Sequence, residues 1–496
     1  MKPTVAVQEP LHLIGETLTL LAWHIPDLVT YQPSEDEYWL APLDDNFPLL
    51  RLNRTGLEML RAMNGHTTVG VLLEKYGNTI CGPDGQPGQW HLERWATPNY
   101  SLSYYGTEPP GGHRHTTKWD ILLQQVREGW SGQEGFEGEE HLEAFHQHGL
   151  AGNEETDEHF DLIETTVSHL FREPTETLNG LTYGQVLMRQ LRRLGWFNPK
   201  PKVILEVGGG LGYLARDLGG ALLPFQKQHI TYLTLDIARP FLKLQVSRAK
   251  AGGWHCAGIH GNGECLPFSD NSVDLVIDNE NMADMTPAKL TKKELAEGKS
   301  DSEHHQEALD WIRRARLSIG HELPDEVIFN LGPIRFVAEL WRILKPGGHA
   351  FLTEFGIDEG WPSPVKLPGH TEYEVQYGHL RQAVRWLGFQ ERYLSLPQFL
   401  ALIPDTKVLC TGAAYTIQRF CQAMNKPFTV RAYTEKELQQ ALGGMLPNLH
   451  GCHYHDVADP AWFSLLDFKV LLLEKPGVAP KASFTVNKGY RWYSQK

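Results

Sequence analysis

The middle of the chain alternates short apolar runs with helical patterns. Val203–Val207 is an apolar run with one carboxylate, and a cluster of glycines separates it from a helical pattern that begins at Leu214. Ile230–Leu235 and Val273–Ile277 are two further apolar runs. Short runs of this kind are typical of strands that are buried on both faces of a parallel sheet. The pattern therefore predicts an α/β fold.

The glycine cluster after the first run predicts a tight turn against a ligand. It contains Gly208, Gly209, Gly210 and Gly212. Glycine permits the unusual dihedral angles of such a turn, and its bare backbone lets a nucleoside lie close. Glycine turns also mark dinucleotide-binding enzymes, and many bind nothing. Asp236 ends the second run, where the second strand of a doubly wound sheet places an acid on a ribose.

Four segments in this order resemble the class I S-adenosylmethionine-dependent methyltransferases. They are residues 203–213, 230–236, 261–278 and 344–355, and the last two begin with the turns Gly-Asn-Gly-Glu and Leu-Lys-Pro-Gly-Gly. The resemblance covers residues 159–475. It implies a doubly wound Rossmann-like sheet and S-adenosyl-L-methionine as the cofactor.

The resemblance also implies which residues hold the cofactor. Glu206, Gly208, Gly210 and Gly212 are expected at its methionine part, and Asp236 at the ribose hydroxyls. Asn262, Gly263 and Glu264 are expected beside the adenine. Family members commonly carry Asp where this chain has Asn262, but an amide oxygen can still accept a hydrogen bond from the adenine amino group.

The segment after the third apolar run is dense in hydrogen-bond acceptors and lies where methyl acceptors bind in this fold. It includes Asp278, Asn279, Glu280 and Asp284, and it is similar, together with His370 and Glu372, to the MidA-like methyltransferases, which are best known for methylating protein arginine. This resemblance implies a catalytic group of Glu280, Asp278 and Asn279. It implies substrate binding by Asp284, His370 and Glu372. A carboxylate suits a guanidinium and also a side-chain amide, so the acceptor stays open.

The first 80 residues have the pattern of a separate small α+β domain. Its strand candidates are Leu18–Trp23, Leu28–Tyr31, Tyr38–Ala41 and Leu49–Leu52, and two Thr-capped helical patterns follow them. The segments Leu52–Leu60 and Asn64–Val69 resemble the PqqD-like domains. Those domains are winged-helix modules that bind the leader of ribosomally made peptides. The resemblance implies a precursor peptide as the partner.

The remaining segments connect or cover these two domains. Residues 81–158 carry Gly- and Pro-rich turns and an acidic stretch, which predict a linker with a mobile region at 129–158. Residues 286–330 interrupt the sheet pattern with dense charge and are expected to form a lid at the carboxyl ends of the strands. Residues 476–496 form a tail.

The acidic composition narrows the expected partners. The formal net charge of −14 argues against a surface built for nucleic-acid phosphates or anionic lipid. The sequence has no run of eighteen apolar residues and no signal-like N-terminus, and its six cysteines lack regular spacing. These features predict a cytoplasmic protein. No paired Cys-x-x-Cys occurs, so no bound metal is expected, and the oligomeric state stays open.

The features together favour a methyltransferase that N-methylates side chains of a ribosomally made precursor peptide, with the leader bound by the N-terminal domain. A protein-arginine or small-molecule methyltransferase with a structural N-terminal domain is one alternative. A non-catalytic, cofactor-binding assembly factor or peptide carrier is another.

Overall fold

The protein's structure, a computed structural model, divides into two units. The described residues are 29–35, 37–41, 50–52, 54, 57, 58, 157, 160, 161, 164, 166–197, 200–320, 323–367, 370–409, 411–450, 454–456 and 465–477. The larger unit comprises Phe136–Glu155, Ile163–Ile403 and Val457–Lys496. The smaller unit comprises Met1–Gly135, Thr156–Leu162 and Pro404–Asp456. Each unit is described by itself.

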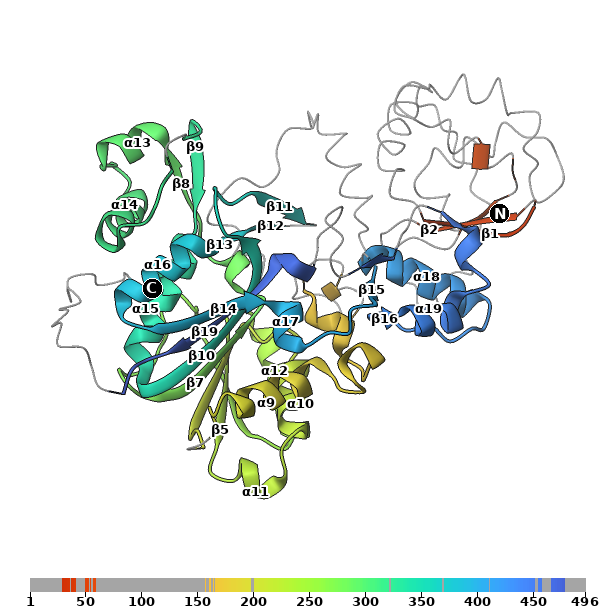
Figure 1. Cartoon of the computed structure of the whole chain (residues 1–496), viewed down its shortest axis with the longest axis horizontal. Helices are drawn as coiled ribbons and strands as arrows, with labels where there is room; N and C mark the ends of the chain where they lie inside the picture. The colour runs from red at the N-terminus through yellow and green to blue at the C-terminus, as the bar shows by residue number, and fades with distance from the viewer. Residues whose placement is uncertain are drawn as a thin grey trace, which may run out of the picture. The chain divides into compact units, whose positions relative to one another are not determined.

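The larger unit is built on an eight-stranded sheet (Figure 1). Its strands are β4 (Val203–Val207), β5 (Thr231–Asp236), β6 (His255–His260), β7 (Val273–Asn279), β10 (Leu344–Ile357), β13 (Val375–Gln376), β14 (Gln390–Ser395) and β19 (Phe468–Glu474). Their spatial order is β14-β19-β10-β7-β4-β5-β6, and β13 pairs with the end of β10.

The strand directions place a ligand crevice beyond β4. Strands β6, β5, β4, β7 and β10 pair in parallel, whereas β19 runs antiparallel to both β10 and β14. The carboxyl ends of the five parallel strands therefore meet at one edge of the sheet. The chain proceeds outward from β4 to β5 and β6 on one side and resumes at β7 on the other. Open α/β sheets bind their ligands at such a switch point.

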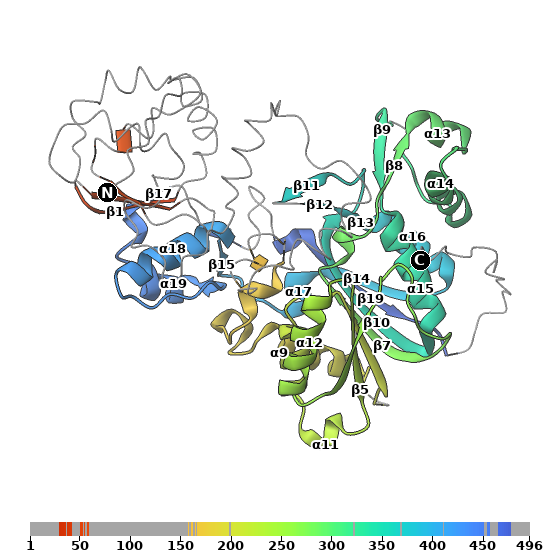
Figure 2. The same cartoon turned by 180° about the vertical axis from the view of Figure 1, so that it is seen from behind.

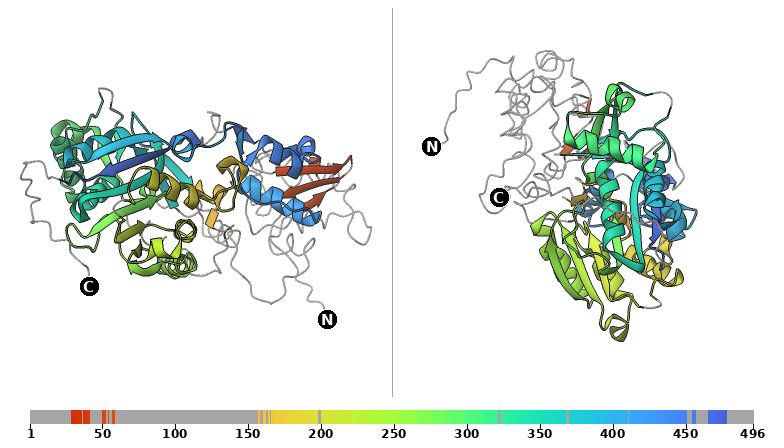
Figure 3. Two further views of the ribbon diagram at one scale, coloured as in Figure 1. Left: turned by 60° about the horizontal axis from the view of Figure 1, so that its bottom comes forward. Right: turned by 90° about the vertical axis from the view of Figure 1, so that its left-hand side faces the viewer.

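Helices cover both faces of this sheet (Figure 3). Those of one face are α9 (Tyr183–Arg193), α10 (Tyr213–Gly220) and α12 (Arg239–Ala251), and those of the other are α15 (Leu331–Ile343) and α16 (Tyr377–Leu387). Alternate residues of a strand point to opposite faces. Leu205 and Val207 of β4 accordingly join the core of α15 and α16, while Glu206 points toward Gln245 of α12.

Short elements complete the larger unit. They are η3 (Ser168–Phe171), η4 (Glu176–Leu178), α11 (Pro224–Lys227), η5 (Met282–Asp284), α17 (Leu396–Leu400), η7 (Leu465–Asp467) and the antiparallel pair β11 (Pro364–Leu367) and β12 (His370–Tyr373). Helix α9 begins at a capping box, in which the Gln185 side chain accepts from Thr182 N at 3.1 Å and Thr182 Oγ1 accepts from Gln185 N at 3.4 Å.

The predicted lid, residues 286–330, is a small α/β insertion (Figure 2). Strands β8 (Ala288–Thr291) and β9 (Glu326–Phe329) pair antiparallel, and α13 (Lys292–Glu297) and α14 (Glu303–Ala315) lie between them in the chain. Leu290, Leu295 and Leu309 of the insertion are buried in the same core as α15. The insertion is therefore packed onto the sheet domain, and its role as a lid stays a prediction.

The smaller unit contains a four-stranded antiparallel sheet of order β17-β1-β2-β3. Its described elements are β1 (Val29–Ser34), β2 (Glu37–Ala41), β3 (Leu50–Leu52), β15 (Thr406–Val408), α18 (Thr411–Ala423), β16 (Tyr433–Thr434), α19 (Glu435–Leu442), η6 (Leu446–Asn448), β17 (Leu449–His450) and β18 (His455–Asp456). Tyr31 and Trp39 pack on Phe420 of α18. The ring centroid of Phe420 lies 6.0 Å from that of Tyr31 and 6.4 Å from that of Trp39. Segments from both ends of the chain therefore share one core.

The structure confirms the doubly wound α/β sheet that the apolar runs predict. Residues 404–456, which the sequence assigned to the domain at 159–475, cluster with the N-terminal strands. The strand candidate Leu18–Trp23, most of the two N-terminal helical patterns, most of the linker 81–158 and most of the tail 476–496 lie outside the described residues. The winged-helix assignment and the domain boundaries stay predictions. No helix of the described ranges is long and apolar enough to cross a bilayer.

Candidate active site

The glycine turn lies at the carboxyl end of β4. Gly208, Gly210 and Gly212 have φ values of +62°, +47° and +81°, which residues with a Cβ rarely adopt. A Cβ on Gly208 would stand 2.2 Å from Asn281 Oδ1, and one on Gly212 would stand 2.6 Å from Gln245 Cα. The turn is therefore enclosed by the segment after β7 on one side and by α12 on the other.

Glu206 presents a buried carboxyl group beneath this turn. Its side chain accepts a hydrogen bond from the Tyr232 hydroxyl at 3.1 Å, while Oε1 is buried and accepts none within the described part of the chain. Burial raises the pKa of Glu206 to about 8. A buried carboxylate oxygen in need of a donor fits the ammonium group that the methionine part of the cofactor carries.

Asp236 ends β5 and is nearly inaccessible to solvent. Its Oδ1 accepts from Ala238 N at 2.7 Å, and its Oδ2 accepts from Gln245 Nε2 at 2.6 Å. Gln245 also donates to Gly210 O at 3.0 Å, so it joins the ribose position to the glycine turn. The sequence did not single out Gln245, because an amide on an amphipathic helix carries no distinguishing pattern.

The predicted adenine residues follow β6. Asn262 is exposed, and its Oδ1 accepts from Glu264 N at 2.8 Å. Gly263 approaches the tip of β4, since a Cβ there would stand 3.2 Å from Val207 Cγ1. Glu264 accepts from Thr286 N at 2.8 Å and forms an ion pair with Arg335 Nη1 at 2.9 Å. This pair fixes the turn at the start of the insertion.

Asp278 and Asn281 close the crevice at the end of β7. Asp278 is fully buried, its Oδ2 accepts from Asn281 Nδ2 at 2.9 Å, and its Oδ1 has no hydrogen bond among the described residues. Burial raises the pKa of Asp278 to about 8. Because Asn281 also abuts Gly208, the predicted catalytic segment and the glycine turn are in direct contact.

Glu280 is held in a strained and buried position. Its φ of +59° is unusual for a residue with a side chain, and such strain is common at functional sites. Its carboxylate accepts from Val167 N, from Ser168 N at 3.1 Å and from Asn279 Nδ2 at 2.8 Å. Burial raises the pKa of Glu280 to about 7, although these hydrogen bonds oppose the rise.

The three predicted substrate-binding residues are brought together. His370 Nε2 lies 3.7 Å from Asp284 Oδ1 and 3.5 Å from Glu372 Oε1, and the His370 and Glu372 side chains are buried. Glu164, which the sequence did not single out, joins them with Oε2 at 3.8 Å from His370 Nε2. Burial, and then the charge of Asp284, raises the pKa of Glu164 well above its usual value.

The sequence did not indicate two further residues of the site, Glu354 and Tyr183. Glu354 near the end of β10 is buried and accepts from Ala283 N at 3.1 Å and Phe355 N at 2.9 Å. Tyr183 at the start of α9 donates to Asn279 Oδ1 at 2.5 Å. Glu354 was detectable in principle, because a carboxylate inside an apolar strand is uncommon. A helical tyrosine carries no such signal.

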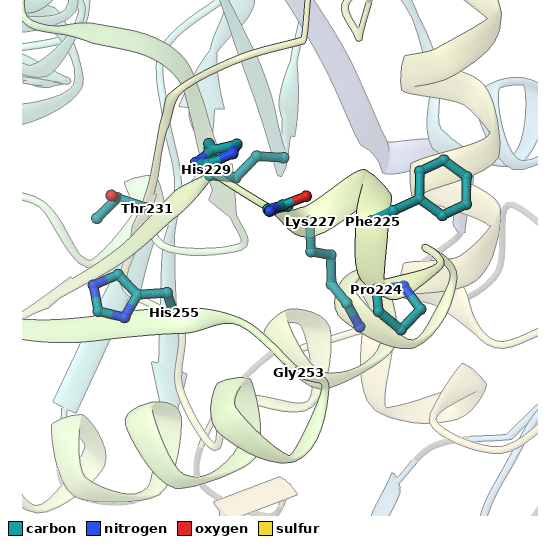
Figure 4. A pocket seen from close by; sticks show the side chains of 9 residues that line it. Pro224, Phe225, Lys227, His229, Thr231, Gly253 and His255 are labelled. Carbon is teal, nitrogen blue, oxygen red and sulfur yellow. The ribbon is translucent and has the colours of Figure 1, made fainter.

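A separate surface pocket lies at the opposite end of the strands (Figure 4). Pro224 and Phe225 of α11 line it, together with Thr231 and His255, the first residues of β5 and β6. The crevice beyond β4 is formed by the carboxyl ends of the strands, so this pocket belongs to neither the cofactor nor the acceptor position.

Residues 205–296 match the family of methyltransferase domains. The matched segment begins in β4 and ends in α13, so it contains the cofactor residues of the glycine turn, Asp236, the loop 262–264 and the acids after β7. No curated protein matches the chain.

Several solved structures are similar. An uncharacterized protein from Burkholderia thailandensis is 17% identical with a TM-score of 0.39, over 76% of this chain and 96% of that one. Another protein of that organism, bound to S-adenosyl-homocysteine, is 16% identical with a TM-score of 0.38, over 61% and 79%. Phosphoethanolamine N-methyltransferase 2 of Haemonchus contortus is 14% identical with a TM-score of 0.30, over 58% and 52%.

The fold, the glycine turn and the family match define an S-adenosylmethionine-dependent methyltransferase. Its cofactor is S-adenosyl-L-methionine. The residues present fit this group, because the glycine turn leaves no side chain in its way and Glu206 offers a buried oxygen that needs a donor.

Proposed function

We propose that the protein methylates side-chain nitrogen in a ribosomally made precursor peptide and binds the peptide's leader through its N-terminal domain. The observation that carries the nitrogen assignment is the concentration of buried carboxyl groups at the ends of β7 and β10. Asp278, Glu280 and Glu354 are all buried there. Such a wall offers acceptor oxygens to N–H donors, and each member that ionises repels an anionic acceptor such as a carboxylate or phosphate.

Glu280 is the residue that we assign to the acceptor nitrogen. Val167 N, the backbone and side chain of Ser168, and Asn279 Nδ2 hold the Glu280 carboxylate in place. A substrate N–H would reach it by sharing one of these acceptor oxygens, since each carboxylate oxygen can accept more than one hydrogen bond. The Glu280 pKa of about 7 suits a group that takes up the proton released when nitrogen gains a methyl group. Asn279 donates to Glu280, and Asp278, which accepts from Asn281, closes the crevice. The cofactor, when bound, supplies the electrophilic methyl group.

The segments that resemble MidA-like methyltransferases support this assignment. Their polar residues Glu280, Asp284, His370 and Glu372 come from distant parts of the sequence, and the last three lie within one cluster. The acceptor class within the proposal is a guanidinium or a side-chain amide, because both present N–H donors in the geometry that a carboxylate accepts.

Leader binding rests on the PqqD-like sequence and on the sheet of the smaller unit. Among the strands that the structure describes, β3 is at the edge of the order β17-β1-β2-β3. A sheet edge can pair with an extended peptide through backbone hydrogen bonds. Anchoring the leader raises the local concentration of the core peptide to about the millimolar range, which favours methylation of a weakly nucleophilic nitrogen.

The test uses the product of a small open reading frame beside the gene as the candidate precursor peptide. The full-length enzyme, S-adenosylmethionine and either the complete precursor or its leaderless core are incubated, and tandem mass spectrometry locates each added methyl group. We expect methyl groups on side-chain nitrogen, and at least tenfold slower modification of the leaderless core. Methylation of oxygen, or an equal rate for both substrates, contradicts the proposal.

A second candidate is a protein-arginine or small-molecule methyltransferase whose N-terminal domain is structural. The shared core of Tyr31, Trp39 and Phe420 favours a structural N-terminal domain, because this packing would account for the N-terminal strands without any peptide binding. Deleting residues 1–80 would expose that core. Comparing the two peptide substrates on the intact chain is therefore the cleaner experiment.

A further inference from the structure

Four side chains from three separate segments converge beside the acceptor end of the crevice. They are Glu164 before η3, Asp284 of η5, and His370 and Glu372 of β12. One ligand atom from each lies within 4.8 Å of all the others. Two ligands of one metal ion, each about 2.0–2.3 Å from it, stand at most about 4.6 Å apart, so the cluster has nearly the size of a coordination shell.

The cluster places three carboxyl groups close together where they are largely shielded from solvent. The exposed fractions of the side chains are 8% for Glu164, 17% for Asp284, 1% for His370 and 2% for Glu372. Three carboxylates so close together repel one another, and burial removes the water that would screen them. The arrangement therefore needs a positive charge or added protons.

The distances around His370 favour a single ion between the groups. Its Nε2 is 3.5 Å from Glu372 Oε1, 3.7 Å from Asp284 Oδ1 and 3.8 Å from Glu164 Oε2. These distances exceed the 2.7–3.2 Å of an N–H···O hydrogen bond. They are close to the spacing of about 3.4 Å between two ligands of a tetrahedral zinc ion, since each ligand is about 2.1 Å from the metal.

The Glu164 carboxylate supplies an independent observation. Its side chain is more than nine-tenths buried, and it reaches the cluster through Oε2. Its other oxygen, Oε1, is buried and accepts no hydrogen bond from any described residue. A buried carboxylate oxygen without a donor is costly, and a cation coordinated by that carboxylate would remove the cost.

We propose that Glu164, Asp284, His370 and Glu372 bind one divalent metal ion. One imidazole with three carboxylates suits Zn²⁺ or Mn²⁺, and the absence of a thiolate from this donor set disfavours Cu⁺ and iron–sulfur clusters. A substrate guanidinium fits less well. Carboxylate oxygens on opposite sides of a guanidinium stand roughly 6–8 Å apart, because each lies about 2.9 Å from a nitrogen, and this exceeds the width of the cluster.

A metal ion at this site would connect three segments that surround the proposed acceptor position. Glu164 precedes η3, whose backbone also donates to Glu280 at Ser168 N. Asp284 belongs to the segment after β7, and β12 follows β10. An ion bound to all three would fix the position of Glu280 through η3 and restrict access to the acceptor from the side of β12.

Calorimetry on the full-length protein tests the site without substrate or cofactor. The protein is treated with a chelator and dialysed, and Zn²⁺ or Mn²⁺ is then titrated. We expect one tight equivalent per chain, and binding weakened about 100-fold or more in His370→Ala and in Glu164→Gln. His255→Ala removes an exposed histidine of β6 and controls for loose surface binding. It should retain the tight equivalent.

Each other outcome overturns the metal site. The absence of a tight equivalent in the wild-type protein does so, as does equal affinity in His370→Ala, Glu164→Gln and wild type. Methylammonium or methylguanidinium that binds in place of metal, and is lost in the same variants, would identify a substrate-cation pocket instead. Thermal melting and S-adenosylmethionine binding check that each variant folds. Because no peptide is present, this test can fail while the proposed function holds, and the reverse is also true.

Discussion

The backbone N–H of Ser168 donates a hydrogen bond of 3.1 Å to the carboxylate of Glu280. This contact joins η3, which precedes the sheet domain in the chain, to the end of β7. Glu280 therefore has a structural role as well as the proposed role at the acceptor nitrogen. A single variant will affect both, and the two effects must be measured separately.

Glu280→Gln should lower both stability and turnover. The amide replaces one acceptor oxygen with an NH₂ group that faces backbone donors, which costs about 1–3 kcal/mol and lowers the Tm by a few degrees. Loss of the acceptor contact and of the proton acceptor should reduce kcat about 100-fold or more. Differential scanning fluorimetry and single-turnover assays with the precursor peptide measure the two effects.

The matched control for this variant is Glu176→Gln, because Glu176 is an exposed glutamate in the nearby η4. It should leave both the Tm and kcat unchanged. S-adenosylmethionine affinity should stay within a few-fold of wild type in Glu280→Gln. Wild-type turnover in Glu280→Gln would remove Glu280 from the chemistry.

Gly208→Ala should weaken cofactor binding. The new Cβ would stand 2.2 Å from Asn281 Oδ1, and alanine disfavours a φ of +62°. Asn281 would have to move and would lose its hydrogen bond to the buried Asp278. We expect at least a tenfold rise in the Kd for S-adenosylmethionine by calorimetry.

Gly220→Ala provides the control for this glycine variant. Gly220 ends α10, and a Cβ there would meet no atom within 4 Å. Alanine should therefore leave cofactor affinity unchanged and keep the Tm or raise it slightly. Equal affinities of Gly208→Ala and wild type would show that the turn adapts, and would separate it from cofactor binding.

The prediction of the fold succeeded because its signals are local. A strand that is buried on both faces appears in the sequence as an apolar run, and a tight turn appears as a group of glycines. The sequence of residues 203–212 alone therefore predicts a strand followed by a turn. Asp284, His370 and Glu372 were expected to bind substrate. No sequence pattern indicates that Glu164 joins them. It comes from a charged segment far away in the sequence, and only the folded chain places its carboxylate beside His370.

The expectation of no metal stays a prediction, and it too depended on local sequence signals. It rested on the absence of paired cysteines, whereas a carboxylate–imidazole site has no fixed spacing in the sequence. The assignment of residues 404–456 to the domain at 159–475 also stays a prediction, and it depended on equally local patterns. Their helices are visible as amphipathic patterns, but nothing in the pattern reveals that Phe420 packs against Tyr31 and Trp39.

Glu206 should make cofactor binding depend on pH. Burial raises its pKa from 4.5 in the unfolded chain to about 8 in the free enzyme, so between these values the folded protein holds a proton that the unfolded chain has lost. Stability of the free enzyme therefore falls as pH rises through this window, by up to about 1.4 kcal/mol per pH unit from this group. Pairing with the cofactor's ammonium group favours the ionised form, so affinity should rise from pH 6 to 8.

Glu206→Gln isolates this contribution, because the amide oxygen can still accept from the Tyr232 hydroxyl. The variant should bind S-adenosylmethionine more weakly at pH 8, with a smaller rise in affinity between pH 6 and 8. Its free form should be more stable than wild type at pH 8. Calorimetry in buffers of different ionisation enthalpy should show proton release on binding for wild type and less for the variant. Identical pH profiles would contradict the assignment.

Arg335 couples the insertion to the predicted adenine loop. Its guanidinium pairs with Glu264 at 2.9 Å and with Glu307 of α14 at 2.8 Å, and its side chain is only 13% exposed. Arg335→Ala would leave Glu264 buried without its cation, which costs about 3–5 kcal/mol. We expect a marked fall in Tm and, because Glu264 also fixes Thr286, weaker S-adenosylmethionine binding.

Two further substitutions decide whether this effect comes from the geometry of the pair. Arg335→Lys keeps the charge but loses the planar fork that serves two carboxylates, so it should fall between wild type and Arg335→Ala in both Tm and affinity. Arg313→Ala removes an exposed arginine of α14 whose pair with Asp310 lies at the surface, and should change stability by less than about 1 kcal/mol. If Arg335→Ala lowered the Tm but kept full affinity, the insertion would stabilise the fold without supporting the adenine loop. If Arg335→Ala weakens S-adenosylmethionine binding and Arg313→Ala does not, the Arg335 side chain is what couples α14 to the cofactor site.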